Sequence, residues 1–557
     1  MASIPVIVKH QGKKYDVEVD TSNPGEVLKY QLYSLTGVEP ERQKVLVKGG
    51  QLKDDTDMSK LGLKPKQVLM MLGTPSGAGL DLERPAEPVK FVEDMTEAER
   101  AAQQNATPAG LVNLGNTCYL NSTLQTLRSI PELQDALVKY DTGSGGGLGF
   151  GTDIVADLRD LYKKMAETQG SPEPIIFLNT LRNVFPQFAE RSQSSNAYAQ
   201  QDAEEAWSQI LGQIRSKVKM ADGDKAAVPF VDKYMSGKFS TVLKCDEEGG
   251  EEPVTSTEEF LKLNCHISGT TNHLRDGIAA SLTEKIEKNS DALGRETTFT
   301  KTSQISRLPK YLTVHFMRFF WRRDSQKKAK IMRKVTFPKE LDLVEFCTDE
   351  LKSQLVPVRD KVREIRKDEE DIERSRKRRK VRDAADVAGG FGEPSGPVGE
   401  KKKREQKKEE EEKAKKEKDG DTQMTEAFKT DAELDAERDA ALLQAKKDLH
   451  AAISPELRED DGANQSGIYE LRAVLTHQGS SADSGHYTAY VKKSARADPK
   501  TGKKAEEDGN WWWFNDDRIS EVGGDKIETL SGGGESHSAL ILLYRAIDLP
   551  SASGVVE

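Results

Sequence analysis

Cysteine is scarce in this sequence. Only four cysteines occur among 557 residues, too few for the disulfide framework of a secreted domain. Long apolar runs are also missing: no stretch of about 18 apolar residues suggests a membrane-spanning helix. The first ten residues lack the basic and then apolar pattern of a signal peptide. These absences favour a reducing cytoplasmic or nuclear setting and argue against a membrane partner.

Positive charge is in deficit. Lysine and arginine number 83 against 93 aspartates and glutamates, giving a net charge of −10 at pH 7 and a pI near 5.6. A nucleic-acid-binding surface needs clustered basic residues, so this balance argues against a nucleic-acid partner. The length predicts about three or four domain-sized units.

Residues 1–73 predict a small β-rich domain. Two Val- and Ile-rich runs in PVIVKHQGKKYDVEVD are separated by His-Gln-Gly, which is typical of a hairpin. NPGEVLKYQLYSLTG has apolar residues at helical spacing, with a proline near its start and a glycine at its end. KVLVKGGQL and KQVLMMLG supply two more strands, so the predicted order is ββαββ.

This order, together with VLVKGGQLKDDTDMSKLGLKPKQVLMML, resembles the ubiquitin-like domain family, whose fold is the β-grasp. The resemblance implies that Leu46 and Met71 occupy positions of the apolar patch with which ubiquitin binds its partners. The segment continues into Leu72-Gly73-Thr74 and does not end in Gly-Gly. It therefore implies a fixed docking module and not a conjugated tag. Ordinary core strands without a docking role are the alternative.

The rest of the chain divides by composition. Residues 74–105 combine proline, glycine and mixed charge, which predicts a flexible linker. From 106 to 549, helical and strand-like segments alternate and predict one large α+β domain, with 550–557 as a C-terminal tail. Residues 356–461 interrupt this domain: 17 of the 20 residues in 401–420 are charged. Such a stretch is expected to bury no core, so it predicts a charged surface insertion, partly helical and partly disordered.

Cys118 is the first candidate for chemistry. It lies in GLVNLGNTCYLNSTLQTL, where Gly-Asn-Thr precedes it and a helical pattern follows it. A thiol at a helix N-terminus feels the positive end of the helix dipole, so we expect a lowered pKa and a nucleophilic thiolate. A buried structural thiol is the alternative for any isolated cysteine.

A base and an orienting group follow far downstream. His486 comes after a Ser- and Gly-rich loop at the start of a strand in SADSGHYTAYVKK. WWWFNDDRIS places Asn515 and Asp516 behind an aromatic strand. Cysteine, histidine and a carboxamide or carboxylate in this order are typical of a nucleophile, a base and the group that orients the base.

These segments resemble the ubiquitin-specific protease family of cysteine deubiquitinases, which has a papain-like fold. The resemblance spans nearly all of 108–544 except the insertion, through GLVNLGNTCYLNS, QQDAEEAW, LPKYLTVHFMRF, and SGHYTAYV with FNDD. With the N-terminal unit, it points to the proteasome-associated branch of that family. It implies hydrolysis of the isopeptide bond after the C-terminal glycine of ubiquitin, with no cofactor.

The resemblance also assigns roles. Cys118 matches the nucleophile, His486 the general base, and Asn515 the third member, whose amide oxygen would accept from the Nδ1–H of the imidazole. Asn113 matches the side-chain donor of the oxyanion hole. Asp516 is expected to supply charge or to orient the site.

Substrate and metal ligands are a further implication. Asp202 and Glu205 match positions that contact the basic tail of ubiquitin. A charge at a helix N-terminus and a solvated helix face explain these two residues equally well. Many members hold structural zinc with two Cys-x-x-Cys pairs, but Cys245 and Cys265 stand alone here, so no metal is expected.

Segments 318–330 and 478–485 resemble two loops that obstruct the channel for the ubiquitin tail. The resemblance implies a monomer that is nearly silent when free. It would act on polyubiquitinated proteins at the regulatory particle of the 26S proteasome, in the cytoplasm and nucleus. The basic run 374–382 is either a nuclear address or a solvated charged surface. The alternative functions are a mainly non-catalytic adaptor for ubiquitin and proteasome and, more weakly, a protease for another ubiquitin-like modifier.

Overall fold

The computed structural model describes residues 3–551 except 11–12, 48–49, 66, 74–106, 142–151, 193–196, 223–224, 323–326, 389–430, 482–483, 495–506 and 535. These residues form two compact units, one within Met1–Asp94 and one within Met95–Glu557. The predicted linker and the most charged part of the insertion lie outside the described residues. None of the described helices is long and apolar enough to cross a membrane.

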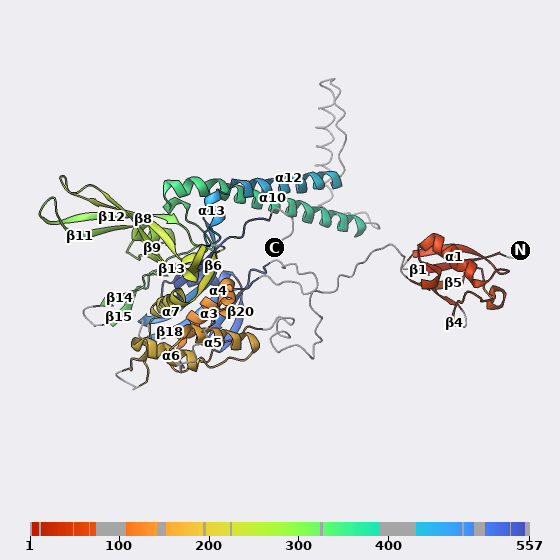
Figure 1. Ribbon diagram of the computed structural model, residues 1–557, viewed down its shortest axis with the longest axis horizontal. Coiled ribbons are helices and arrows are strands. Elements are labelled where there is room, and N and C mark those ends of the chain that lie inside the picture. The colour runs from red at the N-terminus through yellow and green to blue at the C-terminus, as the bar shows by residue number, and fades with distance from the viewer. Residues whose placement is uncertain are drawn as a thin grey trace, which may run out of the picture. The chain divides into compact units, whose positions relative to one another are not determined.

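The N-terminal unit is a five-stranded sheet on which one helix packs (Figure 1). Its elements are β1 (Ser3–His10), β2 (Lys13–Asp20), α1 (Gly25–Thr36), β3 (Lys44–Val47), β4 (Gly50–Gln51) and β5 (Gln67–Leu72). The strand order is β2-β1-β5-β3-β4, with β1 antiparallel to β2 and parallel to β5. This is the β-grasp arrangement, so the predicted fold of this unit is confirmed.

Side chains of β5 alternate between the core and solvent, as the two-residue period of a strand requires. Met71 is 1% exposed, whereas Val68, Met70 and Leu72 are each 52% exposed. The assignment of Met71 to an exposed docking patch is therefore wrong, because its side chain fills the core. Met70 faces outward instead, and it pairs across the sheet with Leu46, which is 44% exposed.

The second unit is built around a ten-stranded sheet whose main path is β10-β13-β21-β17-β18-β19-β20. These strands are β10 (Leu263–Cys265), β13 (Tyr311–Phe316), β17 (Ile468–Ser481), β18 (Ser484–Lys492), β19 (Trp511–Asn515), β20 (Arg518–Val522) and β21 (Ser538–Ala546). The shorter β14 (Phe319–Arg322), β15 (Lys327–Lys330) and β16 (Glu340–Asp342) join its margin.

Helices cover one face of this sheet. They are α3 (Cys118–Arg128), α4 (Pro131–Val138), α5 (Ile154–Glu167), α6 (Ile175–Val184) and α7 (Ala203–Lys217). Their apolar sides share one core with residues of β17, β18 and β21 such as Leu475 and Tyr487. The alternate residues Val474 and Tyr490 belong to a second core, which includes residues of α9 (Leu274–Ser281) and α10 (Asp349–Ala388).

A separate antiparallel sheet with the order β11-β12-β8-β9 projects from this body (Figure 1). Its strands are β8 (Gly237–Cys245), β9 (Val254–Phe260), β11 (Thr283–Ser290) and β12 (Arg295–Arg307). The small β6 (Lys219–Asp222), β7 (Lys225–Pro229) and α8 (Phe230–Tyr234) precede it, and α14 (Asp525–Glu528) precedes β21. The mixed architecture confirms the predicted α+β class.

The insertion is anchored in the second core. Its helices α10 and α12 (Asp431–Ala452) lie side by side in Figure 1, and the short α13 (Pro455–Glu459) follows them. Val358, Val362 and Ile365 of α10 are at most 1% exposed. The expectation that this stretch buries no core is therefore wrong for its first part, because apolar residues continue at helical spacing before charge dominates.

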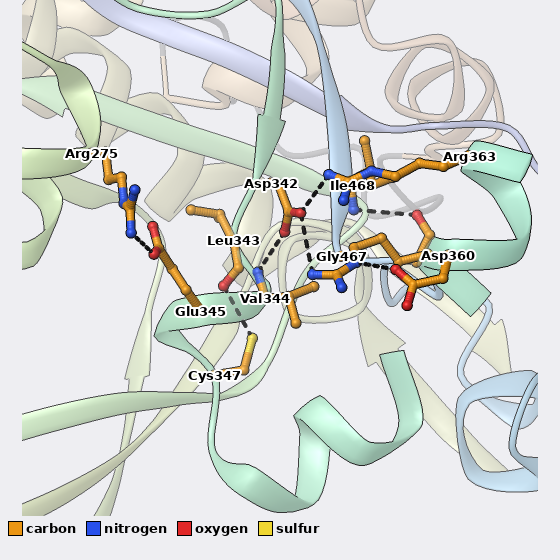
Figure 2. Close-up of polar contacts among 12 residues, drawn as sticks. Arg275, Asp342, Leu343, Val344, Glu345, Cys347, Asp360, Arg363, Gly467 and Ile468 are labelled. Atoms are coloured by element: carbon orange, nitrogen blue, oxygen red, sulfur yellow. Dashed lines mark hydrogen bonds and ion pairs between the residues drawn. The ribbon is translucent and has the colours of Figure 1, made fainter. Parts of the chain in front are cut away.

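Figure 2 shows how α10 is fixed at its root. Asp342, the last residue of β16, accepts hydrogen bonds from the Val344 backbone N–H at 2.9 Å and the Arg363 guanidinium at 2.8 Å. Gly467, just before β17, has a φ of +74°, and a Cβ there would lie 2.3 Å from a methyl carbon of Val344. A larger residue at 467 would therefore force apart the turn that carries α10.

Beyond this root, α10 and α12 form an antiparallel coiled-coil seam. The facing residues recur at alternating spacings of three and four on both helices, which is the heptad pattern. They are Glu369, Ile372, Arg376 and Arg379 on α10, opposite Lys446, Leu442, Asp439 and Asp435 on α12. Ile372 and Leu442 are half-buried and line the same grooves between the helices. Farther out, Arg376 donates to both oxygens of Asp439 at 2.8 Å, and Arg379 lies 2.6 Å from Asp435. Two arginines of the basic run 374–382 therefore bind α12, so this run is not simply a solvated surface.

We expect Arg379→Asp to loosen the outer part of this seam. It places two carboxylates together where an ion pair stood, at a cost of about 1 kcal/mol. Hydrogen exchange of the α12 backbone should accelerate, and the double variant Arg379→Asp/Asp435→Arg should restore protection. Arg378→Asp makes the same charge change at an exposed neighbouring position and serves as the control. Equal exchange in the Arg379 and Arg378 variants would contradict the ionic seam.

Candidate active site

The turn before Cys118 is organised by Asn113. The Asn113 Oδ1 accepts from the backbone N–H groups of Gly115 at 2.9 Å and Thr117 at 3.3 Å, and from the Thr117 hydroxyl at 3.2 Å. The backbone has positive φ at Gly115 (96°) and Asn116 (54°), and α3 then begins at Cys118. Glycine and asparagine are the residues that tolerate this conformation best. The thiol therefore lies at the first turn of a helix, as the sequence predicts.

Asp516 connects this turn to the other end of the chain. Its two carboxylate oxygens accept from the side-chain amides of Asn113 at 2.9 Å and Asn121 at 2.8 Å. Its backbone carbonyl accepts from the Leu111 N–H at 3.1 Å. Asp516 has a φ of 55° in the turn between β19 and β20, which aims the carboxylate at the two amides. Of the two expected roles, the structure favours orientation, and the group that Asp516 orients is Asn113.

His486 is held by Asn515. The Nε2–H of His486 donates to the Asn515 Oδ1 at 2.5 Å. The expected bond through Nδ1 is therefore wrong, since the ring presents its other nitrogen to Asn515. This arrangement leaves Nδ1 as the nitrogen available to exchange a proton with a thiol.

The thiol and the imidazole come together through adjacent backbone positions. The backbone N–H of Tyr487, the residue directly after His486, lies close enough to the Cys118 sulfur to lower the pKa of the thiol. α3 and β18 pack against each other in the first core, where Cys118 and Tyr487 are 3% and 1% exposed. No hydrogen bond joins the Cys118 thiol to the His486 ring within the described part of the chain. The structure thus brings Cys118, His486, Asn515, Asn113 and Asp516 to one place in a resting geometry.

The thiol is protonated in this geometry. Burial and, to a smaller extent, the charge of Asp516 raise the pKa of Cys118 to about 11. The N–H groups of Tyr487 and Tyr119 lower the pKa, but by less than burial raises it. The expectation of a lowered pKa is therefore wrong for this conformation, because removal of the thiolate from water outweighs the helix N-terminus.

Asp202 and Glu205 lie at the start of α7. The Asp202 carboxylate accepts from the Glu204 backbone N–H at 3.0 Å, which is an N-cap contact. This geometry supports the helix-terminal interpretation of Asp202. Glu205 is half-buried, and its charge contributes to raising the pKa of Tyr119, the residue after the proposed nucleophile. The charge of Glu205 therefore acts on the first turn of α3, whereas the Asp202 carboxylate caps its own helix.

Two contributors were not predicted from the sequence. Asn121 is three residues after Cys118 on α3, a spacing that places it on the same helix face and gives a usable signal. Tyr487 acts through its backbone N–H, which no side-chain pattern can reveal. Cys245 and Cys265 are buried free thiols. In the described segments, no three His, Cys, Asp or Glu side chains are grouped so that they could hold a metal ion.

Comparison with known families agrees with this geometry. Residues 109–544 match the family described as ubiquitin carboxyl-terminal hydrolase, and residues 6–76 match the ubiquitin family. The chain belongs to the ubiquitin carboxyl-terminal hydrolase family. As a member, it is a cysteine deubiquitinase with an N-terminal ubiquitin-like domain.

Relatives within the family extend over the whole chain. The ubiquitin carboxyl-terminal hydrolase 6 of Schizosaccharomyces pombe is 43% identical over 98% of this chain and 99% of its own length. The ubiquitin carboxyl-terminal hydrolase 6 of Arabidopsis thaliana is 37% identical, over 97% and 98%. The ubiquitin carboxyl-terminal hydrolase 14 of Caenorhabditis elegans is 31% identical, over 98% and 94%. The similarity thus includes both the ubiquitin-like and the hydrolase parts.

Proposed function

We propose that this deubiquitinase removes ubiquitin from proteasome-bound proteins, with Cys118 as nucleophile, His486 as base and Asn515 as the group that orients the base. One observation carries the catalytic assignment. Asn515 binds the His486 ring at 2.5 Å, and the next backbone N–H, of Tyr487, lies close enough to the Cys118 sulfur to lower the pKa of the thiol. The segments that carry Cys118, His486 and Asn515 are remote in the sequence, and they therefore meet at His486 and its neighbour Tyr487.

The reaction follows from these positions. The Cys118 thiol gives its proton to His486 Nδ1, and the sulfur attacks the carbonyl carbon of the last glycine of ubiquitin. The tetrahedral anion collapses as the lysine amine leaves with the proton from His486. A water then gives a proton to His486 and attacks the thioester, which releases the ubiquitin carboxylate and regenerates the thiol. Ubiquitin recognition by Glu205 and Asp202 is part of the proposal, with Glu205 the better placed.

The oxyanion forms next to Asn113. Asp516 fixes the Asn113 amide through one N–H, so the second N–H remains available for the developing negative charge, alongside the Cys118 backbone N–H. A donor held in this way needs no reorganisation when the charge develops. Such a donor contributes about 3–4 kcal/mol to transition-state stabilisation in well-studied proteases.

Activation by the proteasome is supported by the resting state of two segments beside the site. β15 and β17 are bridged at Ala329 and Ser481. The buried Lys330 ammonium donates to the His477 carbonyl at 2.6 Å, and the Phe319 ring packs edge-on against His477. These contacts join the two ends of segment 318–330 to β17, the strand that leads into segment 478–485. A partner that moves one segment would therefore move the other, together with the strand that carries His486.

A ubiquitin C-terminal electrophile tests the catalytic proposal. We expect the full chain to form a covalent adduct at Cys118, faster with purified proteasome than without it, and Cys118→Ala to form none. The two conditions separate activity from activation. Labelling at full rate without proteasome would contradict activation, and no labelling in either condition would favour the adaptor function. Electrophiles built on other ubiquitin-like modifiers provide the specificity control.

Docking of the ubiquitin-like unit is tested by a neighbouring pair of methionines. Because Met70 is exposed beside Leu46 and Met71 is buried, we expect Met70→Ala to weaken proteasome co-purification by about tenfold, a typical effect of removing an apolar contact. Met71→Leu conserves core volume and should bind normally while the unit stays folded. Proteasome recovery that is unchanged in Leu46→Ala/Met70→Ala would exclude this face. Localisation to cytoplasm and nucleus is proposed on the same basis, as that of a proteasome partner.

A further inference from the structure

His537 lies next to the proposed base, on a loop that no part of the catalytic assignment uses. It immediately precedes β21, and its ring centroid is 6.4 Å from that of His486, with the planes inclined by 71°. This is an edge-to-face arrangement. The His486 ring is also held by Asn515, which accepts a hydrogen bond from its Nε2.

Two threonines fix the ring of His537. Its Nδ1 is 3.2 Å from the Thr476 hydroxyl on β17 and 3.4 Å from the Thr488 hydroxyl on β18. The two hydroxyls are 2.8 Å apart, and both threonines are fully buried. Thr488 is two residues after His486, so it lies on the same face of β18. The loop before β21 is thereby tied across β17 to the strand of the proposed base.

The His537 ring beside His486 is also uncharged. Burial lowers the pKa of His537 to about 4, with smaller contributions in the same direction from His486, Lys330 and Lys526. His537 therefore carries no charge at neutral pH. When His486 takes the thiol proton, its neighbour does not repel the imidazolium. A cation at 537 would oppose that charge.

We propose that His537 is a positioning residue for the reaction: anchored by Thr476 and Thr488, its neutral ring limits the rotation of the His486 imidazole and keeps Nδ1 directed toward Cys118. The inference rests on the proposed catalytic roles of Cys118 and His486. It gives a reason for the position of the His537 ring, whose Nδ1 hydrogen-bonds to the two threonine hydroxyls.

The proposal predicts a separation of rate from stability. In the full chain with purified proteasome, we expect His537→Ala to lower the maximal rate of Cys118 labelling by a ubiquitin electrophile about tenfold, because a misoriented base loses its near-attack geometry. The probe concentration at half-maximal rate should not change, because ubiquitin binding is not affected. His537→Asn keeps a polar group for the threonines but loses the ring edge. Its melting temperature should therefore equal that of the parent chain, while its rate of Cys118 labelling should stay as low as that of His537→Ala.

Controls distinguish this inference from the catalytic assignment. The exposed His266→Ala should label like the parent chain. If the parent labels faster than His486→Ala while both His537 variants equal the parent, the role of His537 is refuted and the catalytic set stands. Recovery of rate and melting temperature together in His537→Asn would also refute it, since the ring edge would then be unnecessary. If the parent labels no faster than His486→Ala, the catalytic set fails, and the inference fails with it.

Discussion

Asp516→Ala should lower kcat by about two orders of magnitude and leave KM nearly unchanged. The carboxylate accepts from both Asn113 and Asn121, at 2.9 and 2.8 Å, so its removal frees the proposed oxyanion donor to rotate. Loss of a single oxyanion-hole donor costs about 10²–10³ in kcat where it has been measured. The substrate ground state makes little use of that donor, so binding should survive. Hydrolysis of a ubiquitin–fluorophore by the activated enzyme measures both constants.

A second substitution at the same position separates orientation from charge. Asp516→Asn removes the negative charge that helps to raise the pKa of Cys118, so the thiol should ionise more readily. Alkylation of Cys118 by iodoacetamide should therefore become faster while kcat falls. The exposed neighbour Asp517→Ala is the control, because the side chain of Asp516, and not that of Asp517, holds the two amides. A kcat equal to that of the Asp517 variant would refute the role of Asp516.

The sequence was sufficient to name the candidate site residues but not to predict how the fold holds them. Cys118, His486 and Asn515 were found because each lies in a box of distinctive residues at a helix or strand end. The roles of the ring nitrogens and of Asp516 depend on backbone geometry, including a φ of 55° at Asp516, that residue order does not display. The pKa of Cys118 was misjudged for a similar reason. The helix dipole is a local effect, whereas burial depends on what packs over the thiol.

The two errors of placement have a common physical cause. In VLMML every residue is apolar, so the polar–apolar alternation that reveals which face of a strand is buried is absent, and Met70 and Met71 exchange roles. In the insertion, charge conceals a heptad seam, because the outer seam positions are themselves charged and paired between helices. Composition alone therefore does not indicate which side chains are buried in either case. Only the partner strand or helix decides what is covered.

Cys118 should be nearly unreactive in the resting chain at pH 7.4. With a pKa of about 11, only about one thiol in four thousand is ionised at that pH. Because the neutral form dominates below this pKa, the rate of alkylation by iodoacetamide should rise about tenfold per pH unit through pH 8–10. Peptide-level mass spectrometry measures the modification of Cys118 alone. The buried Cys265 and Cys347, whose burial raises their pKa to about 12, provide internal references.

Proteasome should change how the rate of Cys118 alkylation depends on pH, and not only raise the rate at every pH. If a partner brings His486 Nδ1 to the sulfur, the thiolate is stabilised by the imidazolium, and a reactive population should appear at neutral pH. His486→Ala should keep the resting profile in both conditions, because it can form no such ion pair. A resting thiol that already titrates near pH 7, with or without His486, would mean that burial does not control the nucleophile. The proposed silence of the free enzyme would then have to arise from blocked access of the ubiquitin tail alone.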